Sequence, residues 1–209
     1  MERLQVHDRD RTGCSSENFL QPGQSIITLA HLFGRSKGSS LKALLERLPS
    51  DKKRIAYLAE ETAEITGLQE FPQYLTLLFE IDAMVLNDDR HLNNIAVLEQ
   101  GGKFDYCPIF DQGAGLLSNT QMSPMEIEPK VLMPALRARP LQMTFNRQIH
   151  TAQALYGPQL RIPKFNREEL EQMLRPLLEY YAQRDRGIIL DRVCETVRVR
   201  QKAMERNCL

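Results

Sequence analysis

The spacing of apolar residues along the chain predicts a protein made mainly of helices. Leucines, isoleucines and alanines recur at intervals of three and four residues in several segments, which is typical of amphipathic helices. Capping residues stand at suitable ends, such as Ser39 or Ser40 before the first segment, Gly67 after the second and Asn166 before a later one. Helices are expected over residues 41–48, 55–65 and 145–156, from Arg167 onward, and in a last segment that runs to about Arg206.

Residues 74–86 differ from these segments because they are apolar almost all the way round. A surface helix would have a polar face, so this helix is expected to be central and buried. Turn-forming residues at 87–89 end it. Two short strands are then expected over 95–99 and 104–110, around a Gln-Gly-Gly turn that is typical of a hairpin. The predicted fold class is mainly α with a small β-hairpin.

Two segments near the N-terminus, residues 25–33 and 34–38, have no clear helical pattern. Residues 25–33 are apolar, and periodicity does not distinguish a strand from a helix there. Residues 34–38 are expected to break regular structure. They resemble a phosphate-binding loop only loosely, because the two glycines are too close and the lysine precedes the second one. A turn followed by an N-cap is therefore predicted.

Composition excludes several classes of protein. The chain has 209 residues with 27 basic and 27 acidic side chains, so no overall positive field indicates nucleic acid as a partner. No apolar run approaches the length of a membrane span, and the polar N-terminus lacks the features of a signal peptide. The cysteines have neither CxxC pairing nor metal-ligand spacing and are interpreted as reduced thiols of a cytoplasmic protein: Cys14, Cys107, Cys194 and Cys208.

Acidic residues are concentrated between residues 80 and 111. This stretch has seven acidic residues against one arginine and one lysine in an otherwise neutral chain. Carboxylates gathered at the end of a buried helix repel one another unless a cation neutralises them. Hard oxygen ligands favour Mg²⁺ over Zn²⁺.

Three residues in this stretch suit phosphoryl transfer. Asp89 and Asn94 lie five residues apart on one loop, and Asp111 follows the second strand of the hairpin. Such a reaction needs a carboxylate that positions the attacking hydroxyl, and an Asn and an Asp that hold Mg²⁺ on the nucleotide phosphates. We expect the three side chains to converge beside a cleft.

The segments NDDRHLNNIAVL and YCPIFDQGAGL resemble the catalytic loop and metal-binding segment of the HipA-like Ser/Thr protein kinases. They are also similar to the DRHxxN and DFG segments of phosphatidylinositol kinases. The resemblance implies ATP and Mg²⁺ as cofactors, Asp89 as catalytic base, and Asn94 and Asp111 as metal and nucleotide ligands. It places His91 in the catalytic loop, which it would brace by hydrogen bonding. Members of the family are often toxin components.

The resemblance covers roughly residues 13–200, including GCSSENFL at its start, and implies a protein-kinase-like C-lobe over 14–209 after an irregular segment at 1–13. Two departures are that Gln112 follows Asp111 and that no Gly-rich loop or strand lysine precedes the helices. The N-lobe is therefore expected to be absent, and the chain to be a fragment, half of a split kinase or a stand-alone lobe. Its partners would be a separate N-lobe or an antitoxin-like protein and a protein substrate. The alternatives are a non-catalytic partner-binding lobe and a lipid or small-molecule kinase.

Neighbouring charged residues are given structural roles. Asp88 is expected to be a cap or a supporting residue, although it is also an alternative base. Arg90 is expected to pair with an acid, and Asp82 to brace the loop. Residues 184–206 contain seven basic and four acidic side chains and are expected to form a solvated helix face. Because the nucleotide is normally enclosed by two lobes, an exposed apolar patch is expected near the N-terminal segment and the hairpin.

Overall fold

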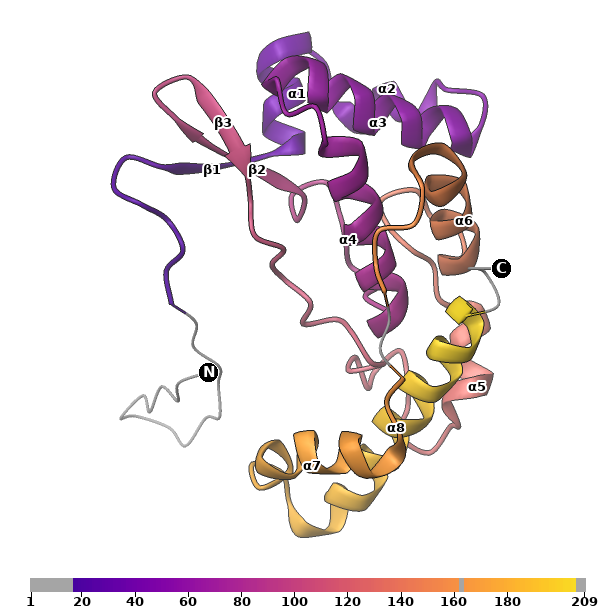
Figure 1. The fold of residues 1–209 in the computed structure, drawn as a ribbon. Helices are drawn as coiled ribbons and strands as arrows, with labels where there is room; N and C mark the ends of the chain where they lie inside the picture. Colours follow the sequence, from indigo (N-terminus) through magenta and orange to yellow (C-terminus); the bar gives the residue numbers. More distant parts are fainter. Residues whose placement is uncertain (1–16, 162–163, 206–209) are drawn as a thin grey trace.

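The computed structural model describes residues 17–161 and 164–205, which form a mainly helical protein with a small three-stranded antiparallel sheet (Figure 1). The expectations for residues 1–13, Cys14 and Cys208 lie outside the described residues. In chain order the elements are β1 (Ser25–Thr28), α1 (Leu29–Lys37), α2 (Leu41–Glu46), α3 (Asp51–Thr66), α4 (Phe71–Val85), β2 (Ala96–Gln100), β3 (Lys103–Tyr106), α5 (Pro129–Leu132), the 3₁₀ helix η1 (Met133–Ala135), α6 (Phe145–Tyr156), α7 (Arg167–Leu178) and α8 (Gln183–Glu205).

Helix α4 is the centre of the core, as its apolar sequence predicts. Its residues face α3, α6 and α8 on different sides, and Figure 1 shows it running through the middle of the molecule. Leu75, Leu78 and Phe79 are at most 1% exposed. A helix that is surrounded in this way needs apolar residues on every side, which explains why the segment lacks a polar face.

The three strands lie beside the helices in the order β1-β2-β3. Ser25 pairs with Glu99, and Val97 pairs with Tyr106. Because successive side chains in a strand point to opposite faces, Val97 joins the main core while its neighbours join a small cluster on the other face. The hairpin turn consists of Gly101 and Gly102, both with positive φ, as a type I′ turn requires.

The structure confirms the predicted helices and resolves the ambiguous segment. Residues 25–33 are divided into β1 and the start of α1, at Thr28, whose hydroxyl accepts a hydrogen bond from the backbone N–H of His31 at 3.3 Å. The prediction of a break at 34–38 was wrong, because α1 continues through Gly34 to Lys37 and ends at Gly38. One glycine costs a helix only about 1 kcal/mol, and Leu29, which is fully buried, helps to anchor this one.

The second strand of the hairpin is shorter than predicted. It ends at Tyr106, and residues 107–110 are irregular. Pro108 has no backbone N–H to offer a neighbouring strand. The carbonyl of Cys107 instead accepts a hydrogen bond from the Tyr74 hydroxyl at 2.7 Å. A side chain thus supplies the hydrogen bond that a neighbouring strand would otherwise make to this carbonyl.

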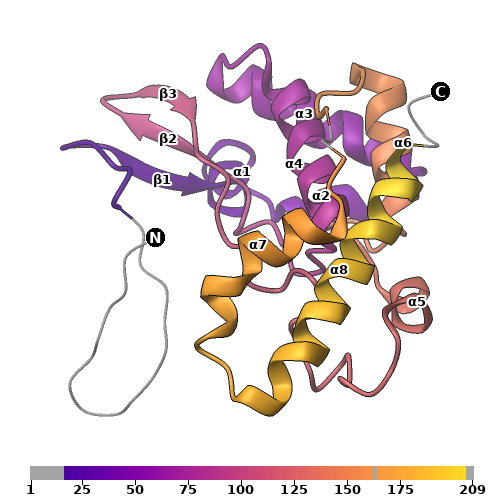
Figure 2. The same cartoon turned by 60° about the horizontal axis from the view of Figure 1, so that its bottom comes forward.

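The C-terminal helices form the lower part of the molecule, with α7 and α8 side by side (Figure 2). The N-cap predicted at Asn166 is present, and it forms a capping box with Glu169. The solvated face predicted for residues 184–206 is wrong for Arg192 and Arg200, which are each 6% exposed. Arg200 donates through Nε to the carbonyl of Ala83 in α4 at 2.6 Å. Arg192 donates to carbonyls of the loop 117–127, so α8 holds both α4 and this loop.

Among the described residues, no helix is long and apolar enough to cross a membrane.

Candidate functional site

The loop 87–94 begins where α4 ends in a left-handed residue. Leu86 has φ 55°, and its backbone N–H donates to the carbonyl of Asp82. Two further backbone bonds fold the loop tightly, from the His91 N–H to the Asp89 carbonyl at 2.7 Å and from the Asn94 N–H to the His91 carbonyl at 2.8 Å. The loop is therefore a compact turn rather than an extended connection.

A buried ion pair holds this turn against α4. Arg90 is fully buried, and its Nε and Nη2 donate to the two carboxylate oxygens of Asp82 at 2.8 and 2.9 Å. Its Nη1 donates to the carbonyls of Asn94 at 2.9 Å and Phe110 at 2.6 Å. Burial raises the pKa of Asp82, while the hydrogen bonds from Arg90 and Asn87 lower it. The structure confirms both predictions, that Arg90 pairs with an acid and that Asp82 braces the loop.

Asn87 connects the same turn to the segment after the hairpin. Its Nδ2 donates to Asp82 Oδ1 at 3.0 Å and to the carbonyl of Asp111 at 3.2 Å. Its Oδ1 accepts a hydrogen bond from the backbone N–H of Asp89 at 3.3 Å. One side chain therefore fixes the backbones of both candidate aspartates.

Asn94 and Asp111 meet as the sequence predicts. Asn94 Nδ2 lies 2.6 Å from Asp111 Oδ2, although 17 positions separate the two residues in the chain. Asp111 has φ 58°, a left-handed conformation that is uncommon for residues other than glycine and that concentrates at functional sites. Arg90 at the Phe110 carbonyl and Asn87 at the Asp111 carbonyl hold the chain on either side of this backbone angle.

The Asp89 side chain is directed to a different partner. Its Oδ1 accepts a hydrogen bond from Arg139 Nη1 at 2.6 Å, and the two side chains are 49% and 44% exposed. Arg139 begins a turn that is closed by backbone bonds between Ala138 and Met143, and its carbonyl accepts a hydrogen bond from Gln148 in α6. The pair thus links the loop to a segment 50 residues further along the chain.

The other two residues of the loop have less defined roles. No helix begins at Asp88, so it is not the helix cap that was considered. Desolvation raises the pKa of Asp88 above its ordinary value, and the charge of Arg139 opposes that shift. The His91 ring does not show the bracing hydrogen bond that was expected, since its buried Nδ1 has no partner among the described residues. The backbone of His91 braces the turn instead.

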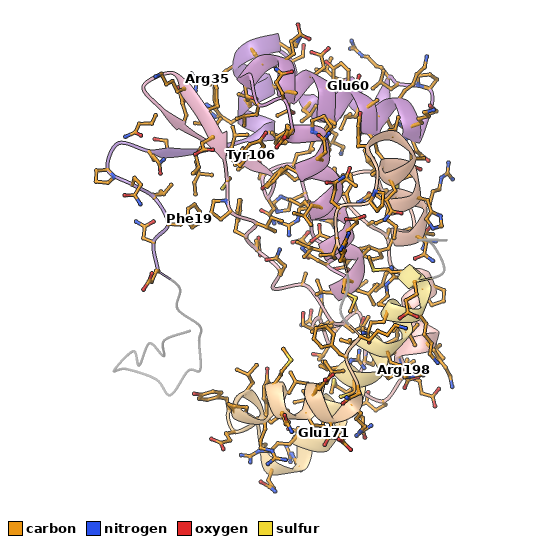
Figure 3. The ribbon with its side chains drawn as sticks, in the orientation of Figure 1. Phe19, Arg35, Glu60, Tyr106, Glu171 and Arg198 are labelled. Carbon is orange, nitrogen blue, oxygen red and sulfur yellow. The ribbon has the colours of Figure 1, made fainter. Side chains whose placement is uncertain are left out.

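An apolar cluster lies on the outer face of the sheet, next to the segment that carries Asp111. It consists of buried Ala96, Leu98 and Cys107, with Leu20 and Phe110 packed against them. Desolvation raises the pKa of the Cys107 thiol to about 11, as expected in an apolar environment. Phe19 and Ile26 nearby are 37% and 38% exposed, and Figure 3 shows Phe19 on the segment that leads into β1. Two partly exposed apolar side chains therefore lie near the N-terminal segment and the hairpin, and the docking surface expected there stays a prediction.

The donor set at Asn94 and Asp111 suits a magnesium ion that is held partly by its substrate. Among the described residues, no three His, Cys, Asp or Glu side chains lie close enough together to hold a metal ion. Mg²⁺ commonly takes one or two protein oxygens and completes its shell with water and phosphate oxygens. The Asp111 carboxylate and the Asn94 amide oxygen, on side chains that touch through the Asn94 amide nitrogen, could supply two such ligands.

Sequence reasoning missed Arg139, because the only signal was an arginine in a proline-containing stretch. It also missed a surface depression of about 810 Å³ that Arg139 helps to line together with the loop residues His91, Leu92 and Asn93. Searches of protein-family models, of curated proteins and of solved structures found no match to this chain.

Proposed function

We propose that this chain forms the C-lobe of a HipA-like Ser/Thr protein kinase, which transfers the γ-phosphoryl group of ATP to a protein hydroxyl. The observation that carries the proposal is the contact between Asn94 and Asp111, 2.6 Å apart, with Asp89 at the start of the loop that contains Asn94. Phosphoryl transfer requires a hydroxyl-orienting carboxylate close to an Asn and an Asp that bind magnesium. The resemblance of both segments to HipA-like kinases assigns the same residues to these roles.

The proposal gives each side chain a separate task. Asn94 and Asp111 hold Mg²⁺, which neutralises negative charge on the nucleotide phosphates when it is bound. Asp89 accepts the hydrogen bond of the attacking hydroxyl through Oδ2, which accepts no hydrogen bond from any described residue, while Oδ1 stays with Arg139. The buried pair of Asp82 and Arg90 keeps the loop in place without contacting the reacting atoms.

The apolar cluster on the outer face of the sheet supports a nucleotide site at the same place. A purine ring needs an apolar surface beside the position of its phosphates. Leu20 and Phe110, which are partly buried against Ala96, Leu98 and Cys107, offer part of such a surface, and Asp111 follows Phe110 directly. An N-lobe, from another part of the protein or from a separate chain, would cover the exposed Phe19 and Ile26 and enclose the nucleotide.

The test compares Asp111→Asn with Asp89→Asn in the protein supplied with its N-lobe. Asp111→Asn should weaken ATP binding only when Mg²⁺ is present, because it removes a charged metal ligand. Asp89→Asn should leave Mg²⁺-dependent ATP binding nearly unchanged and lower turnover by about 10²–10⁴-fold, which is the usual contribution of a positioned base. Calorimetry with and without Mg²⁺ and transfer of radiolabelled phosphate to protein measure the two effects.

Asp105→Asn is the matched control, because Asp105 is an exposed carboxylate on β3 of the same hairpin. It should change neither quantity. Equal and small effects of Asp89→Asn and Asp111→Asn would contradict the kinase proposal and favour a non-catalytic lobe that binds a partner. Full activity in Asp89→Asn would remove the base role from this residue. Transfer to lipid but not to protein would contradict the proposed substrate class.

A further inference from the structure

The depression of about 810 Å³ lies beside the loop 87–94, on the side where Arg139 contacts Asp89. One wall comes from α2 and the residue before it, a second from the loop residues 91–93, and a third from the turn 139–142. Asp89 is not among the lining residues, but its half-exposed carboxylate contacts Arg139, which is one of them.

Three cations and one carboxylate line the depression: Lys42, Arg54, Arg139 and Glu46. Asp51 and Asp89 pair with Arg54 and Arg139 from outside the lining. The cationic donors left for a ligand are therefore those of Lys42 and of the unpaired edge of Arg139. Arg54 is held in place by the Leu45 carbonyl at 3.1 Å and by Asp51. Lys42 is 80% exposed, and its ammonium lies 4.0 Å from Glu46, so this contact is weak and leaves the lysine free to bind another anion.

Arg139 connects the depression to the proposed catalytic carboxylate. Its contact with Asp89 uses Nη1 only, and within the described chain Nε and Nη2 of Arg139 make no hydrogen bond. A guanidinium has five donors in a planar fork and can bind two carboxylates on different edges. An acidic group bound to the free edge would lie close to Asp89.

We infer that this depression binds an acidic segment of the protein substrate, so that the preferred phosphoacceptor hydroxyl is flanked by carboxylates. The inference rests on the proposed kinase function and adds the substrate class to it. A carboxylate of the substrate binds the free edge of Arg139 and another lies near Lys42. Their binding places the neighbouring Ser or Thr hydroxyl beside Asp89.

The lining of the depression favours an acidic peptide over nucleic acid. No Phe, Tyr or Trp is among its lining residues, and His91 is the one ring there, whereas single-stranded nucleic acid is usually held by stacking of successive bases on several aromatic rings. The apolar part of the wall is aliphatic and includes Leu41, Leu45, Leu92 and Leu141. Such a wall suits the apolar side chains of a peptide that also carries acidic residues.

The test is fluorescence anisotropy with two labelled peptides, one with a serine flanked by aspartates and one with asparagines in their place. Wild-type protein should bind the aspartate peptide at least about fivefold more tightly, and added salt should reduce the difference. Lys42→Glu should weaken binding of the aspartate peptide about five- to tenfold, since it replaces an attraction by a repulsion. Glu46→Lys should strengthen it.

Lys130→Glu is the control, because Lys130 in α5 is also an exposed lysine that pairs with a glutamate. It should leave binding unchanged. Equal binding of the two peptides, or equal effects of Lys42→Glu and Lys130→Glu, would overturn the inference. The inference would also be overturned if a single-stranded RNA oligonucleotide bound more tightly than the aspartate peptide and Lys42→Glu abolished that binding. Because this assay needs no nucleotide, it fails or succeeds independently of the Mg²⁺-dependent ATP binding that tests the kinase proposal.

Discussion

Two aspartate–arginine pairs flank the loop 87–94, and they differ mainly in their exposure to water. The inner pair, Asp82 and Arg90, is at most 1% exposed. The outer pair, Asp89 and Arg139, is 49% and 44% exposed. The nitrogen–oxygen distances are similar, 2.8 Å in the inner pair and 2.6 Å in the outer pair. The inner arginine also binds two backbone carbonyls, whereas the outer one keeps free donors. The same chemistry therefore fixes the loop on one side and can exchange partners on the other.

The physical reason for this difference is desolvation. Two charges that are removed from water are costly to separate, because each would remain buried without a partner. A pair that stays in water exchanges its contact for hydration at little cost. A buried pair is thus suited to hold a loop, and a half-exposed pair is suited to a position where a substrate must enter.

The largest effect is expected from Arg90→Met. The substitution leaves the Asp82 carboxylate buried without its cation and removes the donor to the carbonyls of Asn94 and Phe110. We expect the free energy of unfolding to fall by about 3–5 kcal/mol, and the melting temperature by about 10 °C. Thermal and urea unfolding measure both quantities.

The double variant Asp82→Leu with Arg90→Met sharpens this test. Because it removes both charges, it should be destabilised by clearly less than the sum of the two single variants. Additive losses would show that the two side chains contribute through packing rather than through their pairing.

A much smaller effect on stability is expected from Arg139→Gln. The pair with Asp89 is half exposed, so its loss should change the free energy of unfolding by less than about 1 kcal/mol. The same unfolding measurements apply, with Lys130→Glu as the control. A loss as large as that of Arg90→Met would show that the outer pair also holds the fold, and the comparison of the two pairs would not hold.

The smallest effect concerns the titration of Asp88, next to the outer pair. Desolvation raises its pKa, the charge of Arg139 lowers it, and the charge of Asp89 raises it. Arg139→Gln should therefore raise the pKa of Asp88 further, and Asp89→Asn should lower it. Carbon-detected NMR of the carboxyl group measures both shifts. Since the folded-state pKa is raised, Asp88 destabilises the fold as the pH increases through its titration range. A lowered pKa in Arg139→Gln would contradict the assigned charges.

Local sequence signals predicted most of the helices and part of the site. The central helix, the hairpin and the cap at Asn166 follow from residue periodicity and from turn and capping residues close in the chain. The meeting of Asn94 and Asp111 was also predicted, because a hairpin with a short turn fixes the separation of the two segments that it joins. Gly34 was misjudged because burial of its neighbours outweighs the propensity of one residue.

The charged residues show where such reasoning ends. Arg192 and Arg200 belong to a run of charges that is typical of a solvated face, yet both are buried and donate to backbone carbonyls. Arg139 carried no signal for its contact with Asp89. An arginine has the same local pattern whether it faces water or the interior, since its long side chain can reach partners far away in the sequence.

The sequence by itself determined the helical fold class, the buried helix α4, the hairpin and the meeting of Asn94 with Asp111. These depend on spacings within about 25 residues, over which backbone geometry limits the possible arrangements. Only the tertiary structure decided that Asp89 pairs with Arg139, that Arg192 and Arg200 are buried, and that a depression lined by Lys42, Arg54 and Arg139 lies beside the loop. These features join segments that are 50 or more residues apart, where packing rather than local pattern chooses the partner.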